Sequence, residues 1–409
     1  MPASPRILII GAGLQGLSIA LALAARGLPS TLLERRDAPM TGASLGNEGK
    51  IHLGLVYALD PSLDTGRLML EGALSFSPLL DRWLGPQPWA AMRSAGFRYA
   101  VMPGSLASLD SLAEYYARLQ REVPAVKAAL PVQACYVGRP LERFVRSASD
   151  TLGSPVVDGS PVPCLETDEV AVDTSLLASV LTRAVRGNPS IRLRTGVHVL
   201  AARKNRDGYA LHVEANGGQE EIAADIVVNC AWTDRVRIDS TLRPDSEEPS
   251  RCYRVKHRVI VEPSAPLAAF KPVTMVQGPF GDIVPLADGA IYLSWYPECR
   301  TYFDRSPPAE EIRSEEVLRA VGSRTLERMT ELFPALSGAR IRSCSPCVIV
   351  AAGTSDVDRP ESELHRRTHA GPLGGDGWWS VETGKLTLAP LNAERTVRCV
   401  LDELGERSR

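Results

Sequence analysis

The first thirty-five residues carry the clearest pattern of apolar and polar positions in the chain. Apolar residues fill 7–10 without interruption, recur over 14–26 and return at 31–33. A short uninterrupted apolar run is typical of a strand buried on both faces, and the longer run predicts a helix that ends at Gly27. The start of the chain therefore predicts a strand, a tight turn, a helix and a second strand.

The rest of the chain divides into helical and strand-like patterns. Apolar residues at helical spacing predict helices over 60–83, 106–123, 174–186 and 309–333, and an amphipathic helix near the C-terminal end of 374–398. Asp173 or Thr174 is suited to cap the third helix, and Gly187 to end it. Strands are predicted at 191–194, 197–205, 209–214, 224–230, 253–262, 273–277, 282–285 and 290–296, with a hairpin turn at Asp207-Gly208.

This order of elements predicts an α/β fold with two domains. The alternation of predicted strands and helices stops between 85 and 163, where prolines recur, and it resumes near 171. We expect a discontinuous Rossmann-like domain made of residues 1–84, 164–240 and 338–409. Residues 85–163 and 241–337 are expected to form an α+β substrate domain with an antiparallel sheet.

Composition and charge exclude several classes of partner. A formal net charge of -2 gives no electrostatic reason to expect nucleic acid or an anionic membrane. The apolar runs are too short for a signal sequence or a transmembrane segment, so a cytoplasmic location is expected. Cys344 and Cys347 form a C-x-x-C without a second pair, and no metal site is expected.

The glycines between the first strand and helix point to a dinucleotide. Gly11, Gly13 and Gly16 form G-x-G-x-x-G, and Glu34 follows the second strand. Glycines allow the turn and bring backbone amides close to a pyrophosphate, and the acid can bind a ribose diol. The motif by itself leaves FAD and NAD open.

Two further stretches are suited to a cofactor. Residues 41–57 are rich in Gly, Ser and Asn, which favours an extended loop that can run along the cofactor from the adenosine end. Near the C-terminus, Gly384-Lys385-Leu386-Thr387 separates a predicted strand from the last helix.

With these pieces in order, the sequence resembles the D-amino-acid oxidase-like family of FAD oxidoreductases over nearly its full length. Residues 169–184 and 225–231 are similar to that family's central helix and returning strand. Asn47, Gly49, His52 and Gly54 resemble the branch that contains L-2-hydroxyglutarate and glycerol-3-phosphate dehydrogenases. The resemblance implies FAD, held by Gly11, Gly13, Leu14, Gln15, Gly16, Glu34, Arg35, Ser44, Asn47, Gly49, Val199, Gly384, Lys385, Leu386 and Thr387.

Two departures from that branch concern the substrate. Glu48 and Lys50 place charges where the branch carries small or apolar residues. The family's Arg-Pro, which grips an acidic substrate, has no counterpart in residues 345–351, which contain no arginine.

His52 is the first candidate for catalysis, because a histidine near neutral pKa can take a proton or hydrogen-bond the flavin. Lys50 is the second candidate. Lys385 and neighbouring amides are expected to face the flavin where charge builds on reduction. Expected substrate contacts are Tyr253, Arg258, Trp295 and Arg300, and Arg366, Arg367 and His369 precede the last glycine turn.

We therefore predict an FAD-dependent oxidoreductase, either dehydrogenase or oxidase, for a small-molecule substrate. The first expectation is hydride transfer from a CH–OH group of a 2-hydroxy acid or polyol to flavin N5. An amine or amino-acid oxidase is the first alternative, and a non-catalytic or partner-dependent flavoprotein subunit is the second. Oxygen, a quinone and another protein all stay open as electron acceptor.

Overall fold

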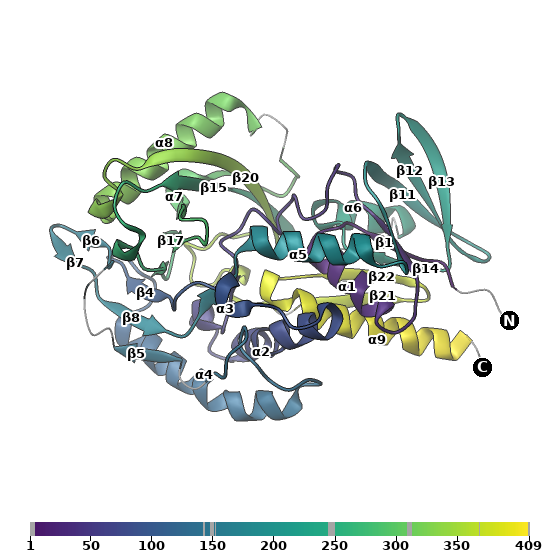
Figure 1. Cartoon of the computed structure of the whole chain (residues 1–409), viewed down its shortest axis with the longest axis horizontal. Coiled ribbons are helices and arrows are strands. Elements are labelled where there is room, and N and C mark those ends of the chain that lie inside the picture. Colours follow the sequence, from purple (N-terminus) through teal and green to yellow (C-terminus); the bar gives the residue numbers. More distant parts are fainter. Residues whose placement is uncertain are drawn as a thin grey trace.

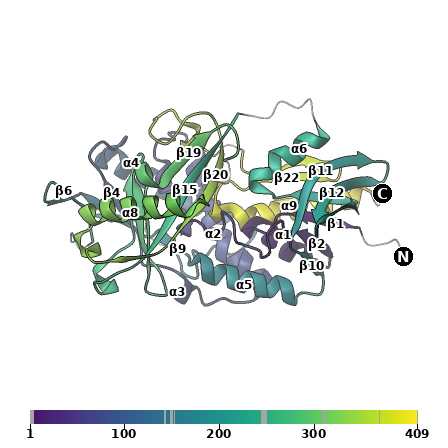
Figure 2. The same cartoon turned by 90° about the horizontal axis from the view of Figure 1, so that it is seen from above.

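The computed structural model describes residues 5–141, 144–147, 151, 153–243, 250–308, 313–367 and 369–407. Two large sheets with their helices form the two halves of the molecule, and both termini lie beside the first (Figure 1). The same division is seen from above in Figure 2. The predicted mixed α/β fold is confirmed.

The first sheet has six strands in the order β10-β2-β1-β14-β22-β21. All neighbours are parallel except β21 and β22. Its strands come from distant parts of the sequence: β1 (Ile7–Ile10), β2 (Ser30–Leu33), β10 (Ile191–Arg194), β14 (Ile226–Asn229), β21 (Gly371–Gly375) and β22 (Trp378–Glu382). The sheet is therefore discontinuous along the chain.

Both faces of this sheet are covered, which explains the uninterrupted apolar run in β1. Ile7 and Ile9 pack into one core with helices α1 (Leu14–Ala24), α5 (Thr174–Gly187) and α9 (Ala389–Arg407). Leu8 and Ile10 pack into another with β11 (Val197–Asn205), β12 (Gly208–Ala215) and α6 (Arg235–Leu242). Because side chains alternate along a strand, an apolar layer on each face requires four apolar residues in a row. β13 (Gly218–Ala224), which was not predicted, extends the β11-β12 hairpin.

The second sheet has nine strands and is antiparallel apart from the β4–β16 pair. Its members are β4 (Arg98–Val101), β5 (Val145–Ser147), β8 (Cys164–Thr167), β15 (Arg251–Glu262), β16 (Val273–Val276), β17 (Gly281–Pro285), β18 (Ile291–Trp295), β19 (Arg300–Asp304) and β20 (Arg340–Ala352). β8 and β20 fall in segments that the sequence assigns to the Rossmann-like domain, yet they pair in this sheet with β4 and β15.

Three long helices cover the second half of the molecule and the contact between the halves. α8 (Glu315–Leu332) packs on β15, β18 and β20. α2 (Asp64–Leu84) packs against both α9 and α4 (Leu109–Ala129). The predicted helices over 60–83, 106–123 and 309–333 match these three, although residues 309–312 lie outside the described part of the chain.

The short elements include the pair β3 (Lys50–Ile51) and β9 (Val170–Ala171), which ties the predicted extended loop to the segment before α5. The others are β6 (Val156–Val157), β7 (Ser160–Pro161), α3 (Trp89–Met92), α7 (Tyr296–Cys299), η1 (Leu55–Tyr57), η2 (Trp232–Asp234), η3 (Leu267–Ala269), η5 (Pro334–Leu336), η6 (Glu363–His365) and η7 (Leu386–Leu388).

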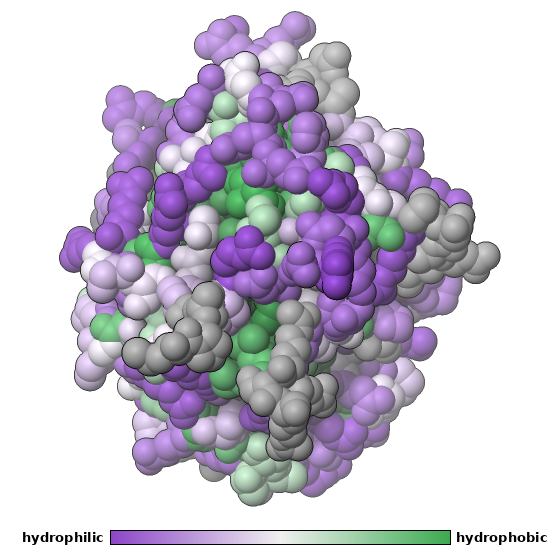
Figure 3. All heavy atoms as spheres, turned by 90° about the vertical axis from the view of Figure 1, so that its right-hand side faces the viewer, coloured by the Kyte–Doolittle hydropathy of each residue, from purple (hydrophilic) through white to green (hydrophobic). Residues whose placement is uncertain are grey.

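The surface is mainly polar at the end that carries both termini. Figure 3 shows hydrophilic residues over most of this face, with hydrophobic residues visible in smaller areas between them. Of the helices in the described residues, none has the length and apolar character needed to cross a membrane.

Candidate active site between the two sheets

The glycine turn after β1 brings three backbone segments into close contact. Gly11 has φ +95°, and a Cβ there would lie 2.7 Å from the carbonyl oxygen of Cys230 at the end of β14. A Cβ on Gly16 would lie 1.9 Å from the carbonyl oxygen of Gly11. Only glycine fits both positions, so α1 starts directly at the carboxyl ends of β1 and β14.

Polar groups at this end suit a ribose and a pyrophosphate. Glu34 accepts hydrogen bonds from the amides of Ala12 (2.8 Å) and Arg36 (3.0 Å) and lines a cavity. Its carboxylate keeps free lone pairs for a ribose diol. Gln15 also lines the cavity, and its buried Oε1 has no hydrogen-bond partner in the described residues. These groups and the N-terminus of α1 fit the adenosine and phosphate part of FAD.

The cavity has a volume of about 330 Å³ and runs between the two sheets. Most of the expected cofactor residues line it: Gly11, Gly13, Leu14, Gln15, Glu34, Arg35, Ser44, Asn47, Val199, Gly384, Lys385 and Leu386. Gly16, Gly49 and Thr387 lie behind the lining and support it. Thr387 Oγ1, for example, accepts from the amide of His52 at 2.8 Å.

The far end of the cavity is formed by the C-terminal turn. Lys385 and Leu386 line it directly before α9, a helix of 19 residues whose first residue, Ala389, also faces the cavity. A helix N-terminus carries partial positive charge, and the Lys385 ammonium adds to it. This end can therefore stabilise negative charge on a bound group.

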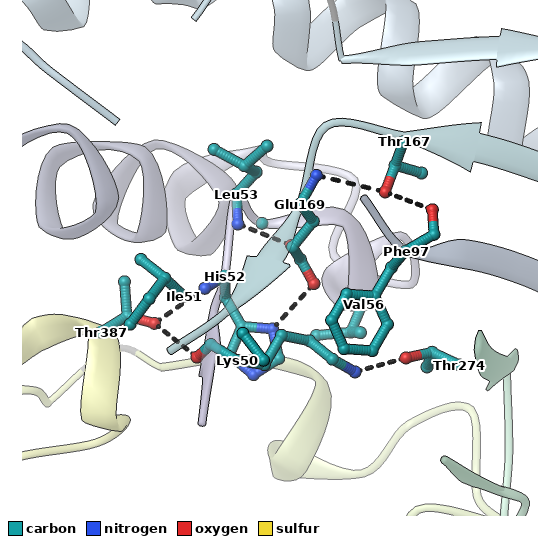
Figure 4. Close-up of polar contacts among 12 residues, drawn as sticks. Lys50, Ile51, His52, Leu53, Val56, Phe97, Thr167, Glu169, Thr274 and Thr387 are labelled. Carbon is teal, nitrogen blue, oxygen red and sulfur yellow. Dashed lines mark hydrogen bonds and ion pairs between the residues drawn. The ribbon is translucent and has the colours of Figure 1, made fainter. Parts of the chain in front are cut away.

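His52 lies beside this turn and has a buried carboxylate behind it. Its Nδ1 is 3.4 Å from Oε1 of Glu169 (Figure 4). The same oxygen accepts from the Tyr99 hydroxyl. The other Glu169 oxygen accepts from the amide of Leu53 at 2.7 Å. The carboxylate of Glu169 close to Nδ1 favours the tautomer that carries its proton on Nδ1, and this leaves Nε2 as the proton acceptor.

Burial sets the charge of this pair. Burial, followed by the positive charge of Lys385, lowers the pKa of His52 below its usual value, so the imidazole is neutral at pH 7. Burial acts to raise the pKa of Glu169, but the hydrogen bonds and charges around its oxygens outweigh burial and lower it. The arrangement is a neutral base held by an ionised carboxylate.

A second group of charges lies on the cavity wall formed by the substrate sheet. Lys50 Nζ contacts Thr274 Oγ1 (Figure 4). It is also 2.9 Å from Oδ1 of Asp282. Lys256 Nζ is 3.4 Å from the other oxygen, Oδ2. One carboxylate thus serves two ammonium groups, and it joins the loop that carries Lys50 to β17.

Glu48 lines the cavity close to these lysines. Burial acts to raise its pKa, yet the ammonium groups of Lys50 and Lys256 lower it below the usual value. No hydrogen bond or ion pair holds its carboxylate among the described residues, whereas Asp282 nearby has both lysines. Glu48 is therefore an ionised group available to a ligand.

Tyr253, Arg258, Trp295 and Arg300, the expected substrate residues, are not part of the cavity lining. Arg258 donates to the carbonyl of Leu45 at 3.0 Å, and Arg300 pairs with Asp356 at 3.2 Å. Trp295 packs against Phe280 in the core of the substrate sheet, and Tyr253 is buried opposite Val350 of β20. Of the residues before the last glycine turn, Arg367 does line the cavity.

Sequence reasoning missed Lys256, Asp282, Tyr292 and Glu169 as site residues. A signal existed for Lys256, because Arg254, Lys256 and Arg258 alternate along a strand and so share one face. Cys347 lines the cavity as well, but burial raises the pKa of its thiol to about 12. Within the described residues no group of three or more metal-binding side chains is placed to hold a metal ion.

Comparison with known proteins agrees with this geometry. A family model described as FAD dependent oxidoreductase matches residues 6–388. The bifunctional protein MnmC of Burkholderia thailandensis, named for tRNA 5-methylaminomethyl-2-thiouridine biosynthesis, is 28% identical over 332 residues, which are 81% of this chain and 44% of that protein. The chain thus spans less than half the length of this relative.

Solved structures give the same fold. Iminodiacetate oxidase from Chelativorans sp. BNC1 matches with a TM-score of 0.67 at 18% identity, over 97% of this chain and 96% of that one. L-α-glycerophosphate oxidase from Mycoplasma pneumoniae, with FAD bound, matches with a TM-score of 0.63 at 16% identity, over 98% and 95%. At these identities the likeness concerns the fold alone.

Proposed function

The chain belongs to the D-amino-acid oxidase-like family of FAD-dependent oxidoreductases, and from this premise we propose that it oxidises an amine, converting CH–NH to C=N. The family establishes FAD and the reaction type. The proposal concerns the substrate, for which the sequence alone puts an alcohol first. Charges inside the cavity are the reason why we place an amine before an alcohol.

The residues of this chain divide the binding of FAD among three places. Glu34 would hold the adenosine ribose, the N-terminus of α1 the pyrophosphate, and Lys385 with the N-terminus of α9 the pyrimidine end of the flavin. When bound there, FAD supplies the acceptor for a hydride from the substrate carbon.

The carboxylate of Glu48 is the observation that carries the proposal. It is ionised, lines the cavity, and has no hydrogen-bond or ion-pair partner in the described residues. A protonated amine can supply N–H donors and a counter-charge in direct contact with this carboxylate. A neutral hydroxyl group in the same place would supply a single donor and no charge in contact with Glu48.

His52 can accept the proton that an amine must lose. An amine reaches the enzyme protonated, and its nitrogen must lose a proton before the neighbouring carbon can give up a hydride. The neutral imidazole of His52 accepts that proton at Nε2, and the carboxylate of Glu169 stabilises the resulting positive charge through Nδ1–H.

The names of similar proteins support an amine. The MnmC relative is named for the biosynthesis of a nucleoside with a methylaminomethyl group, and iminodiacetate oxidase is named for an amine substrate. Oxidation of CH–OH is the second candidate. The pair of His52 and Glu169 favours it, because a hydroxyl group needs a base during hydride loss. The name of the glycerophosphate oxidase favours it as well.

An anaerobic panel tests the proposal. Purified enzyme is mixed without oxygen with primary and N-methyl amino acids, simple amines, 2-hydroxy acids and polyols, and the oxidised flavin band near ~450 nm is followed. The proposal expects at least one amine to bleach the flavin faster than any hydroxy compound. Reduction by hydroxy compounds alone would contradict it, and a flavin that none of them reduces would favour a non-catalytic subunit.

A further inference from the structure

Thr387 connects the C-terminal turn to the segment that carries His52. Its buried Oγ1 accepts a hydrogen bond from the amide of His52 at 2.8 Å and donates one to the carbonyl of Lys50 at 3.3 Å (Figure 4). In the described residues β3 pairs with β9 alone, so no strand lies along this edge of it. One hydroxyl therefore satisfies two buried backbone groups, one on each side of Ile51, that would otherwise need a neighbouring strand.

The same segment is also held on the side of β9. The Tyr136 hydroxyl accepts from the amide of Val170 at 2.9 Å and donates to the carbonyl of Ile51 at 2.7 Å. The backbone around His52 is thus fixed on two sides, and Thr387 provides the contact to the C-terminal turn.

The turn that carries Thr387 is itself closely packed. η7 begins directly after Lys385, which lines the cavity. Helix α2 lies against η7, where a Cβ on Gly72 would be 3.0 Å from the carbonyl oxygen of Thr387 and 3.3 Å from its Cγ2. A turn held this tightly keeps the Thr387 hydroxyl at a fixed distance from Lys385.

We propose that Thr387 is a positioning residue, whose hydroxyl holds His52 at a fixed place relative to the turn that faces the flavin. The catalytic role of His52 rests on the proposed function, whereas the two hydrogen bonds to its segment do not. We propose this role in place of a direct contact between Thr387 and FAD. Thr387 is not part of the cavity lining, and its only O–H donor is used by the carbonyl of Lys50.

The position of His52 matters because a base must lie within hydrogen-bond distance of the proton that it accepts. Without the Thr387 hydroxyl, the buried amide of His52 and the carbonyl of Lys50 lose their partner, which favours a shift of the segment. A displacement of about 1 Å can lower a rate by about 10²-fold. Removal of the hydroxyl should therefore slow the step in which His52 takes part.

Three substitutions of Thr387 separate its hydroxyl from its shape. Thr387→Val replaces the hydroxyl by a methyl group of similar size, Thr387→Ala removes it, and Thr387→Ser keeps it. Thr396→Val is the matched control, because Thr396 is equally buried on α9 and its hydroxyl bonds the carbonyl of Asn392 in the same helix at 2.7 Å. Anaerobic flavin reduction is measured with the panel compound that reduces the wild type fastest. We expect Thr387→Val and Thr387→Ala to lower the rate by about 10- to 100-fold, and Thr387→Ser and Thr396→Val to react nearly as the wild type does.

A double-mutant cycle with His52→Ala shows whether Thr387 acts through the histidine. Residues that act as a unit have non-additive effects on the rate. We expect Thr387→Val to cause no further loss when residue 52 is already alanine. Hydrogen exchange followed by mass spectrometry gives a readout that does not depend on turnover. The amide of His52 should exchange faster in Thr387→Val than in Thr387→Ser.

Four results would overturn the assignment: a normal rate in Thr387→Val, a rate in Thr387→Ser as low as that in Thr387→Val, effects that multiply in the double variant, or unchanged exchange of the His52 amide. If only hydroxy compounds reduce the flavin, the amine proposal fails. The cycle is then run with such a compound and still decides the role of Thr387. Flavin content and melting temperature of each variant check that the fold is retained.

Discussion

At the scale of single residues, the proposed chemistry depends on a histidine that is kept neutral and held next to a carboxylate. Burial lowers the pKa of His52, and its Nδ1 lies 3.4 Å from the carboxylate of Glu169. Glu169 is in turn held by the Leu53 amide and the Tyr99 hydroxyl. The proton acceptor thus points away from Glu169, and two backbone or side-chain donors keep that carboxylate in place.

Replacing His52 tests its role directly. His52→Ala should keep its flavin and lower the rate of flavin reduction by about 10²–10⁴-fold, which is the usual contribution of a general base. Stopped-flow reduction under anaerobic conditions measures this rate. His212→Ala, an exposed position bonded to Gln219, is the control and should react normally. Unchanged reduction in His52→Ala would remove the histidine from the mechanism.

Glu169→Gln should change the pH profile as well as the rate. Glu169 raises the pKa of His52 against the larger effect of burial, so its removal should move the acidic limb of kcat/KM to lower pH. The rate should fall about tenfold or more, because a hydrogen bond to a charged group is lost. A merely structural role would lower the rate and leave the limb in place.

The glycines were predicted from the spacing of a short local motif, whereas His52 was predicted from the resemblance of residues 47–54 to a family loop, in which Lys50 is a departure from the usual pattern. Glu169 and Asp282 were missed as site residues. Glu169 reaches His52 across 117 positions and Asp282 reaches Lys50 across 232. Such partners come together only through the pairing of β3 with β9 and the docking of the two halves, which no local spacing encodes.

At the scale of elements, the contact between β1 and α1 decides whether a cofactor can bind. Gly16→Ala would push a methyl group to 1.9 Å from the carbonyl oxygen of Gly11. Forced overpacking costs about 1–3 kcal/mol and would move the helix N-terminus away from the pyrophosphate. We expect loss of bound flavin and a lower melting temperature, measured by absorbance and calorimetry.

Gly187→Ala is the matched control for that substitution. Gly187 is the last residue of α5, and a Cβ there would meet no atom within 4 Å. Alanine should keep the flavin and leave stability unchanged or slightly higher, since it favours helix more than glycine does. Flavin retained in Gly16→Ala would contradict the proposed role of this turn.

Most elements were predicted from periodicity, and the errors concern sheet membership. The Asp173 cap and the hairpin at Asp207-Gly208 were predicted from local chemistry and are confirmed. β8 and β20 lie in segments assigned from the sequence to the Rossmann-like domain, but they pair with β4 and β15 of the second sheet. A strand pattern gives the buried face and the length, whereas its partner depends on the path of the whole chain.

At the scale of the whole molecule, one buried carboxylate joins the two halves. Asp282 of β17 bonds Lys50 of the cofactor loop at 2.9 Å and lies 3.4 Å from Lys256 of β15. Removing one member of a buried ion pair leaves an uncompensated charge and costs about 3–5 kcal/mol. Asp282→Asn should therefore lower the free energy of unfolding far more than Asp288→Asn, whose half-exposed pair with Arg342 contributes about 1 kcal/mol or less.

The difference in free energy of unfolding between wild type and Asp282→Asn should depend on pH in a defined direction. The pKa of Asp282 is lowered in the folded protein, chiefly because Lys50 and Lys256 outweigh burial. Its contribution is complete above its unfolded pKa of about 3.9 and is lost as the pH falls through the folded value. Denaturant unfolding should show a full gap between wild type and Asp282→Asn at pH 7 that narrows below about pH 4. An unchanging gap would mean that Asp282 is not ionised.

We propose that this FAD enzyme selects amines through Glu48. The most direct test is the rate of anaerobic flavin reduction by matched pairs with one carbon skeleton, such as alanine and lactate or glycine and glycolate, in wild type and in Glu48→Gln. We expect faster reduction by the amine in wild type. In Glu48→Gln, the ratio of the amine rate to the alcohol rate should shift toward the alcohol by about tenfold or more. Faster reduction by the alcohol in wild type, or an unchanged ratio in the variant, would contradict it.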